Sequence, residues 1–341
     1  MDLADDLPAG PGPVPTPRQA PPLDPELAAV LERLGPTARE PVTPENLGAR
    51  QERDAAARPR PTVRQLRDGG RFEAEELRVP GPPNAPDVTL VAARPAGIAG
   101  PLPLLYYLHG GGMITGNAWS VLPRILREWA EPLGPAVVSA EYRLAPGARY
   151  PAAVEDCYAG LLWVAAHAAD LGVDPDRIVI GGKSAGGGLA AALALLTRDR
   201  RGPRPAGQLL MCPMLDDRND TVSSHPRPAS TPGTGYPTRR RGRHCSATGT
   251  APPTCLPMRP PARAADLSGL PPAYLDVGSA ETLRDEAAAY AQGIWQAGGQ
   301  AELHVWPGAF HGFDTLAPAA ALSRDARDAR TRWLRRVLAR T

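Results

Sequence analysis

Short apolar segments alternate with helix-like segments over most of the chain, and this alternation restricts the fold more than any other feature. The segments that read as strands are 72–79, 88–94, 102–108, 136–143, 177–180, 208–215, 273–278 and 301–306. Segments with helical spacing are found at 152–169, after residue 184, at 283–297 and at 319–340. Strand–helix–strand units of this kind build parallel sheets with helices on both faces. The sequence therefore predicts an α/β fold with a mostly parallel, doubly wound, eight-stranded sheet flanked by helices.

The size and charge of the chain restrict what it can bind. Its 341 residues can bury a substantial core, and its 38 Lys and Arg against 36 Asp and Glu leave a net charge of +2. So small a charge argues against nucleic acid or an anionic membrane as partner.

The starting segment MDLADDLPAG lacks the layout of an export signal, and no apolar run approaches the roughly 18 residues of a membrane span. We therefore expect a cytoplasmic protein without stable membrane association.

A serine stands where one predicted strand turns into a helix. The strand at 177–180 is followed by GGKSAGG at 181–187 and then by an alanine- and leucine-rich segment. A turn this tight needs small neighbours and strains the backbone of its central residue. It would lift the Ser184 hydroxyl above the carboxyl edge of the sheet, beside the free N–H groups of a helix amino terminus. This is the position of a nucleophile; a glycine-rich turn selected only for close packing is the alternative.

A second glycine-rich segment, HGGG at 109–112, ends the buried strand 102–108. Backbone N–H groups in such a loop can point at a substrate oxygen. Together with the N–H of Ala185, they would stabilise the oxyanion that forms during acyl transfer. The alternative is a loop whose glycines serve only its backbone conformation.

The four cysteines give no sequence signal for a metal site. They lie far apart, without the spacing of metal ligands, and a chain of this size does not need disulfides. We expect Cys157 and Cys212 to be buried thiols, and we expect neither a metal nor a cofactor.

Several motifs follow one another in a specific order along the chain. They are HGGGMITGN at 109–117, EYRLAPGARYPAAVEDCYAGL at 141–161, GGKSAGGGLA at 181–190, CPMLDDRND at 212–220, LSGLPPAYLDVGSAETLRDE at 267–286 and HGF at 311–313. As a set they resemble the hormone-sensitive-lipase-like esterases, the branch of the α/β-hydrolase fold marked by an HGGG loop and a GDSAGG turn. The resemblance extends over most of residues 24–340. It implies a serine carboxylesterase that hydrolyses short- to medium-chain acyl esters through an acyl-enzyme, without metal or cofactor.

The resemblance also assigns roles to individual residues. It implies that Ser184 is the nucleophile and that His311 is the general base. It further implies that the backbone N–H groups of Gly111, Gly112 and Ala185 form the oxyanion hole. The histidine lies in the loop after the last predicted strand, from which a triad histidine must reach the serine.

The acid of the triad has two candidates. The family usually has Asp in a DPLRDE stretch, where this chain has ETLRDE at 281–286. A carboxylate is needed to hold the imidazole tautomer and to stabilise the imidazolium, and Glu can do this as Asp does. We choose Glu281, which closely follows the strand at 273–278, and keep Asp285 as the second candidate. The order serine, acid, histidine along the chain agrees with this fold.

Other functions use the same fold and residues. A catalytically impaired or ligand-binding protein could keep the fold without turnover, although retention of the three triad residues argues against it. An amidase or a deacetylase would use the same triad, and the sequence does not separate either from an esterase.

The expected partner is a small-molecule ester. Since family members often associate through the last strand and helix, the resemblance also leaves a homodimer open.

The chain is expected to have three parts. Residues 1–23 have the composition of a disordered, proline-rich leader, which cannot bury enough apolar surface to fold. Residues 24–60 are expected to be helical, with Asp24 as a helix cap, and the resemblance implies that they cover the site. Residues 61–341 would form the hydrolase domain.

The chain departs from the family pattern at three places. Lys183 stands where the family generally has Asp, and we expect this change to affect the rate. Gly147 stands where the family has Glu, and we expect this change to affect loop order.

The third departure is the segment 226–262, which contains nine prolines, six arginines and no acid. A structureless loop of this length is uncommon inside a compact domain. We interpret it as the product of two compensating frameshifts, with a genuine disordered insertion as the alternative; reading the coding DNA in the other frames distinguishes them.

Overall fold

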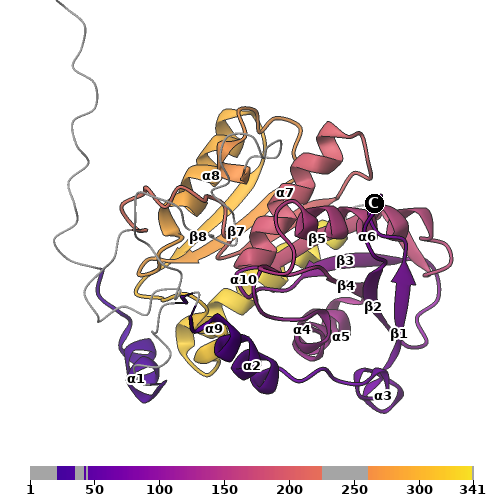
Figure 1. Cartoon of the computed structure of the whole chain (residues 1–341), viewed down its shortest axis with the longest axis horizontal. Coiled ribbons are helices and arrows are strands. Elements are labelled where there is room, and N and C mark those ends of the chain that lie inside the picture. The colour runs from indigo at the N-terminus through magenta and orange to yellow at the C-terminus, as the bar shows by residue number, and fades with distance from the viewer. Residues whose placement is uncertain (1–20, 35–41, 44, 225–259, 340–341) are drawn as a thin grey trace, which may run out of the picture.

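A single sheet of eight strands forms the centre of the protein, in the order β1-β2-β4-β3-β5-β6-β7-β8. The structure is a computed structural model that describes residues 21–34, 42–43, 45–224 and 260–339. Its strands are β1 (Phe72–Val79), β2 (Val88–Pro95), β3 (Leu102–Leu108), β4 (Ala136–Glu141), β5 (Val173–Lys183), β6 (Gly207–Met211), β7 (Ala273–Gly278) and β8 (Ala301–Trp306). β2 runs antiparallel to both β1 and β4, and the other neighbours are parallel. The predicted α/β fold is confirmed (Figure 1).

All the predicted strands are present, but some ends differ. β5 begins at Val173, earlier than the predicted residue 177, and β6 ends at Met211 instead of residue 215. Two backbone features account for the early end of β6. Cys212 has a positive φ of 37°, and Pro213 after it has no N–H for a sheet hydrogen bond.

Helices cover both faces of the sheet. They are α1 (Pro25–Leu34), α2 (Leu47–Ala57), α3 (Val63–Leu66), α4 (Ala118–Ile125), α5 (Glu131–Leu133), α6 (Ala152–Ala166), α7 (Ala185–Asp199), α8 (Arg284–Gln296), α9 (Phe313–Leu316) and α10 (Ala321–Leu338). Alternate residues of β3 divide between two cores. Leu104 and Tyr106 pack with α6, α7 and α8, whereas Leu105 and Tyr107 pack with α4 and α10. The two-fold periodicity of the strand therefore produces the three layers of the fold.

The sequence prediction missed the short helices α3 and α9 and one longer helical region, which runs from α4 through one π-helical turn, Leu126–Ala130, to α5. Asn117 caps it by accepting a hydrogen bond from the N–H of Ser120 at 2.8 Å. Pro123 lies inside α4, where a proline usually argues against a helix. It is the sixth residue of the helix, beyond the first turn, so α4 lacks one of its i→i−4 hydrogen bonds there.

Two expected parts of the chain lie wholly or mostly outside the described residues. Most of the proline-rich leader does so, as does nearly all of the segment 226–262. The end of that segment is described, and it contains the start of a short 3₁₀ turn, Pro261–Arg263, although no regular structure was expected there.

In the part of the chain that is described, no helix combines the length and apolar character needed to cross a membrane.

Candidate active site

Ser184 occupies a sharp turn between β5 and α7. Its φ of 58° and ψ of −118° are unusual for a residue with a side chain, as the sequence predicted for this turn. Its N–H donates to the carbonyl oxygen of Met211 at 2.8 Å. A Cβ on Gly186 would lie 2.0 Å from the carbonyl oxygen of Leu108, so only glycine fits there. The turn holds the hydroxyl at the carboxyl edge of the sheet, with 6% of the residue exposed.

The HGGG loop lies directly beside this turn. A Cβ on Gly110 would approach the carbonyl oxygen of Lys183 to 2.8 Å. Gly111 has a φ of 124°, and a Cβ there would lie 2.1 Å from the carbonyl oxygen of Thr115. Among the described residues, no acceptor pairs with the N–H groups of Gly111, Gly112 or Ala185. These three donors are therefore free to bind an oxygen beside the serine.

His109 stabilises the base of the HGGG loop. Its ring stacks on Tyr142 with a centroid separation of 4.1 Å, and the Tyr142 hydroxyl donates to the His109 carbonyl oxygen at 2.7 Å. Burial lowers the pKa of His109 to about 4, so the ring is neutral at physiological pH. Its contacts are those of a loop anchor and not of a base facing the serine.

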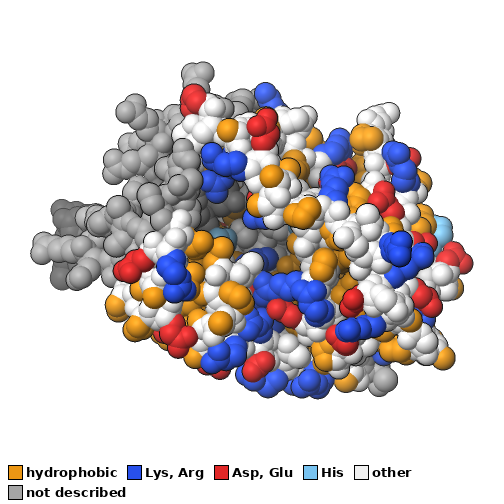
Figure 2. Space-filling model, turned by 90° about the horizontal axis from the view of Figure 1, so that it is seen from below, with side chains coloured by type: hydrophobic (Ala, Val, Ile, Leu, Met, Phe, Trp, Pro, Cys, Tyr) orange, Lys and Arg blue, Asp and Glu red, His pale blue; other side chains and the backbone are white. Residues whose placement is uncertain are grey.

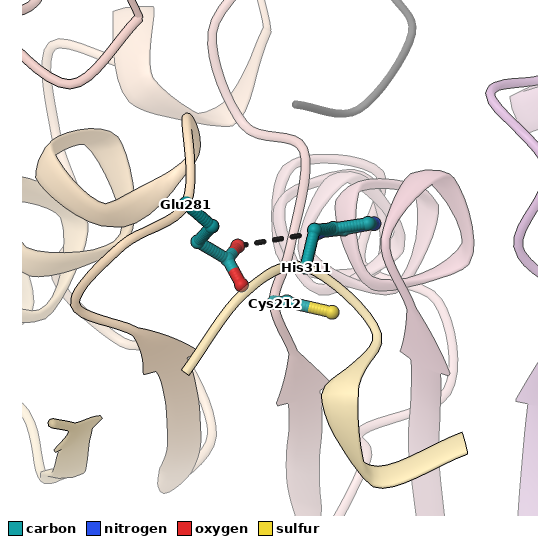
Figure 3. Close-up of side chains that lie close together, drawn as sticks. All are labelled: Cys212, Glu281 and His311. Atoms are coloured by element: carbon teal, nitrogen blue, oxygen red, sulfur yellow. Dashed lines mark hydrogen bonds and ion pairs between the residues drawn. The ribbon is translucent and has the colours of Figure 1, made fainter. Parts of the chain in front are cut away.

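His311 lies between Ser184 and Glu281. Its Nε2 is 3.0 Å from the Ser184 hydroxyl, and its Nδ1 is 3.2 Å from Oε1 of Glu281. Figure 3 shows the carboxylate pointing at the ring. Glu281 is 1% exposed, and its other oxygen accepts a hydrogen bond from the N–H of Gly278 at 3.2 Å. The arrangement fits an Nδ1–H that donates to the carboxylate and an Nε2 lone pair that faces the hydroxyl.

Asp285, the second candidate for the acid, is engaged elsewhere. Its carboxylate accepts hydrogen bonds from the N–H of Ser223 at 2.6 Å and from Arg284 Nε at 2.7 Å. The structure thus brings Glu281 to His311 and directs Asp285 toward the segment after β6.

Cys212 is a neighbour of His311 that sequence reasoning did not place in the site. A donor atom from each of Cys212, Glu281 and His311 lies within 4.8 Å of the other two (Figure 3). Burial of the ring acts to lower the pKa of His311, but the Cys212 sulfur and the Glu281 carboxylate outweigh burial and raise it. Because Cys212 directly follows β6, its place at the carboxyl edge of the sheet was the available signal. These three residues could also hold a metal ion.

Lys183, which stands where the family generally has Asp, pairs with an acid on another segment of the chain. Lys183 Nζ donates to Asp314 Oδ1 at 2.5 Å and to Thr315 Oγ1 at 2.5 Å. Arg124 and Arg330 also bind Asp314, at 2.8 Å and 2.6 Å. Burial acts to raise the pKa of Asp314, but the three cations hold it well below its usual range. Sequence reasoning missed this buried cluster, which joins the residue before Ser184 to the helix after His311.

Both amino-terminal helices contact the loops of the site. α1 packs on Phe310 and Phe313, which flank His311. On α2, Gln51 donates to the carbonyl oxygen of Ile114 at 2.8 Å, and Asp54 accepts from the N–H of Gly116 at 3.1 Å. The face of the protein seen in Figure 2 carries interspersed positive and negative side chains.

Comparisons with known proteins agree with the motifs. A family model for the alpha/beta hydrolase fold matches residues 105–315. Carboxylesterase NlhH of Mycobacterium tuberculosis is 36% identical over 256 residues, which cover 72% of this chain and 78% of that protein. Esterase LipI of the same organism is 31% identical over 306 residues, covering 89% and 86%. The solved structure of Bacterial Heroin Esterase is 39% identical with a TM-score of 0.78, covering 94% of this chain and 98% of that one.

Three findings support the same family: the sheet order, the matched family model, and the identity to named esterases over most of the chain. The chain belongs to the hormone-sensitive-lipase-like esterases of the α/β-hydrolase fold, and it is a carboxylic ester hydrolase.

Proposed function

We propose that the protein hydrolyses short- to medium-chain acyl esters with Ser184 as nucleophile, His311 as general base and Glu281 as the acid of the triad. The observation that carries this proposal is the continuous chain of hydrogen bonds, 3.0 Å from Ser184 to His311 and 3.2 Å from His311 to Glu281. These separations lie close to the range needed for proton transfer in an unliganded site.

The mechanism follows from these positions. His311 Nε2 takes the hydroxyl proton while Ser184 Oγ attacks the ester carbonyl carbon. The oxyanion that forms is stabilised by the N–H groups of Gly111, Gly112 and Ala185. His311 then gives the proton to the departing alcohol, and an acyl-serine forms. Water, deprotonated by His311, attacks this acyl-enzyme and releases the carboxylic acid.

The burial of the site supports a small acyl group. Ser184 is 6% exposed, and the side chain of His311 is 17% exposed. The contacts of α1 and α2 with the His311 and HGGG loops support a role for residues 24–60 as a cap. We expect a cap over the site to favour short chains over long ones.

Replacement of the nucleophile tests the proposal. Ser184→Ala removes the attacking oxygen, so hydrolysis of p-nitrophenyl esters should fall by at least about 10⁴-fold, as in other enzymes that lose the nucleophile of a triad. The measurement is the initial rate on acetate, butyrate, octanoate and palmitate esters, with the highest kcat/KM expected for acetate or butyrate.

Ser139→Ala is the matched control. Ser139 is a fully buried serine of β4, and its hydroxyl has no hydrogen-bond partner in the described part of the chain. This variant should keep the wild-type rate. Equal rates for Ser184→Ala and Ser139→Ala would contradict the proposed nucleophile, and a maximum on palmitate would contradict the proposed chain length.

A further inference from the structure

Three loops at the carboxyl edge of adjacent strands bring a thiol, a carboxylate and an imidazole together. Cys212 follows β6, Glu281 follows β7 and His311 follows β8, and these strands are neighbours in the sheet. Cys212 and Glu281 are buried, and the esterase mechanism does not use the thiol. In the described part of the chain, this is the one group of at least three such side chains whose donor atoms converge.

The spacing of the donor atoms is close to that of a zinc site. Tetrahedral zinc with bonds of about 2.0–2.3 Å to nitrogen, oxygen and sulfur separates its ligand atoms by about 3.4–3.6 Å. His311 Nδ1 and Glu281 Oε1 are 3.2 Å apart, which already agrees. All three donors lie within 4.8 Å of one another, so each needs to move by only about 1 Å or less to close on an ion.

The backbone conformation of Cys212 fixes the position of its thiol. The residue holds a φ of 37°, in the left-handed region that costs free energy for a residue with a side chain. Its N–H donates to the carbonyl oxygen of Asp276 at 2.7 Å, which holds it against β7. The thiol is therefore held toward His311 by the sheet, as Figure 3 shows.

We propose that the Cys212 thiolate, the Glu281 carboxylate and His311 Nδ1 bind a thiophilic divalent cation such as Zn²⁺ or Cd²⁺, and that this ion reversibly switches the esterase off. A ligand set with one thiolate, one imidazole and one carboxylate suits these ions and leaves a fourth position for water. Mg²⁺ and Ca²⁺ prefer sites made only of oxygen ligands and should bind poorly. The inhibitory part of this inference depends on the proposed function; the binding part does not.

Inhibition follows from where the protons go. When the ion binds, the Cys212 thiol loses its proton to solvent as the metal–sulfur bond forms. The ion takes the Nδ1 lone pair of His311, so in the neutral ring the proton resides on Nε2. Nε2 then faces Ser184 with a hydrogen in place of a lone pair and cannot accept the hydroxyl proton. Binding releases a thiol proton, so affinity should rise with pH.

Binding is tested without reference to activity. The full-length Ser184→Ala protein, with Cys245→Ser and Cys255→Ser to remove the two cysteines outside the described residues, is titrated with Co²⁺ as a spectroscopic substitute for Zn²⁺. We expect a thiolate-to-cobalt charge-transfer absorption with a stoichiometry of one ion per chain, removed by added Zn²⁺. Cys212→Ala in this background should abolish the absorption. Cys157→Ala, the same change at the other described cysteine, should preserve it.

Inhibition is tested with Ser184 present. The rate of each variant in Zn²⁺ is divided by its own rate in chelator, so differences in basal activity cancel. Cys212→Ala should raise the Zn²⁺ concentration for half inhibition by at least about tenfold, because even residues that only support a ligand typically change metal affinity 10–100-fold. Cys157→Ala should not change it, and addition of chelator to the inhibited wild type should restore the rate.

The two proposals fail in different ways. Absence of the thiolate absorption in the Ser184→Ala protein, or its persistence in Cys212→Ala, would overturn the metal site even if the esterase is active. A cobalt–thiolate spectrum that depends on Cys212 in a protein without esterase activity would support the site and contradict the proposed function. Equal inhibition of wild type and Cys212→Ala would overturn the switch.

Discussion

Glu281 and Asp285 lie four positions apart in the sequence, yet only Glu281 faces the imidazole of His311. The difference arises because Glu281 lies within the loop between β7 and α8, whereas Asp285 is already inside α8 and turned toward Ser223. A glutamate side chain is one methylene longer than aspartate, so it can reach the ring from this position. At the residue scale, the local path of the backbone therefore determines which of the two candidate acids lies beside His311.

The pH profile should report the charge of Glu281. The Cys212 sulfur and this charge raise the pKa of His311, and the proposed base must be neutral to act, so kcat/KM should rise with pH through that pKa. Glu281→Gln removes the carboxylate charge that stabilises the imidazolium, while burial of the ring still disfavours the imidazolium. We expect activity to fall by about 10²–10⁴-fold. The acidic limb of the remaining activity should lie at a lower pH than in the wild type.

Asp285→Asn is the control for this measurement. It should leave the acidic limb of kcat/KM in place, because Asp285 makes its contacts with Ser223 and Arg284. An acidic limb that moves in Asp285→Asn and stays fixed in Glu281→Gln would reverse the assignment of the acid.

Lys183 should contribute to stability through Asp314. Lys183→Met removes one of three cations from a buried carboxylate and should lower the free energy of unfolding by about 1–3 kcal/mol at neutral pH. Because the pKa of Asp314 is depressed, this stabilisation is lost as the pH falls through the acidic range, so the two proteins should converge in strongly acidic buffer. Denaturant unfolding at several pH values measures the difference.

Arg71→Met provides the comparison with an exposed ion pair. Arg71 lies 3.2 Å from Glu131, with side-chain exposures of 60% and 48%. Such a pair contributes at most about 1 kcal/mol. A loss in Arg71→Met as large as in Lys183→Met would show that burial of the Asp314 cluster has no special effect.

Among the elements, α1 has a simple connection to the site. Asp24 accepts a hydrogen bond from the N–H of Leu27 at 3.1 Å and so caps the helix, as the sequence predicted. Leu27 and Leu31 are buried in a small core with Phe310 and Phe313. This core is distinct from the two cores that flank the sheet, and Trp306 packs against both it and the core beside α4 and α10. The helix therefore stabilises the loop of His311 with little effect on the rest of the molecule.

Leu27→Ala should loosen this contact. Removal of a buried leucine typically costs about 2–5 kcal/mol, and a helix that packs through so few side chains should detach as a unit. We expect faster amide hydrogen exchange in residues 308–317 and a lower kcat/KM, with unchanged exchange in β3. In the same helix, Leu34 is 40% exposed, and Leu34→Ala should change neither quantity. Equal effects of the two substitutions would contradict the role of α1.

At the scale of the whole molecule, the sequence predicted the sheet and the positions of the site loops because both depend on local patterns. Apolar segments marked the strands, and parallel strands necessarily place their following loops at one edge. The approach of Cys212 to His311 and the pairing of Lys183 with Asp314 were not predicted. These contacts join residues about a hundred or more positions apart, and no periodic spacing records which side chains meet after the sheet twists.

The ion pair between Lys183 and Asp314 has a consequence for protein engineering. A designer who grafts the family's GDSAGG turn into this scaffold would import an aspartate at position 183. That aspartate would then face Asp314, in a place where the native protein has opposite charges. Position 183 and position 314 should therefore be designed together in such a chimera.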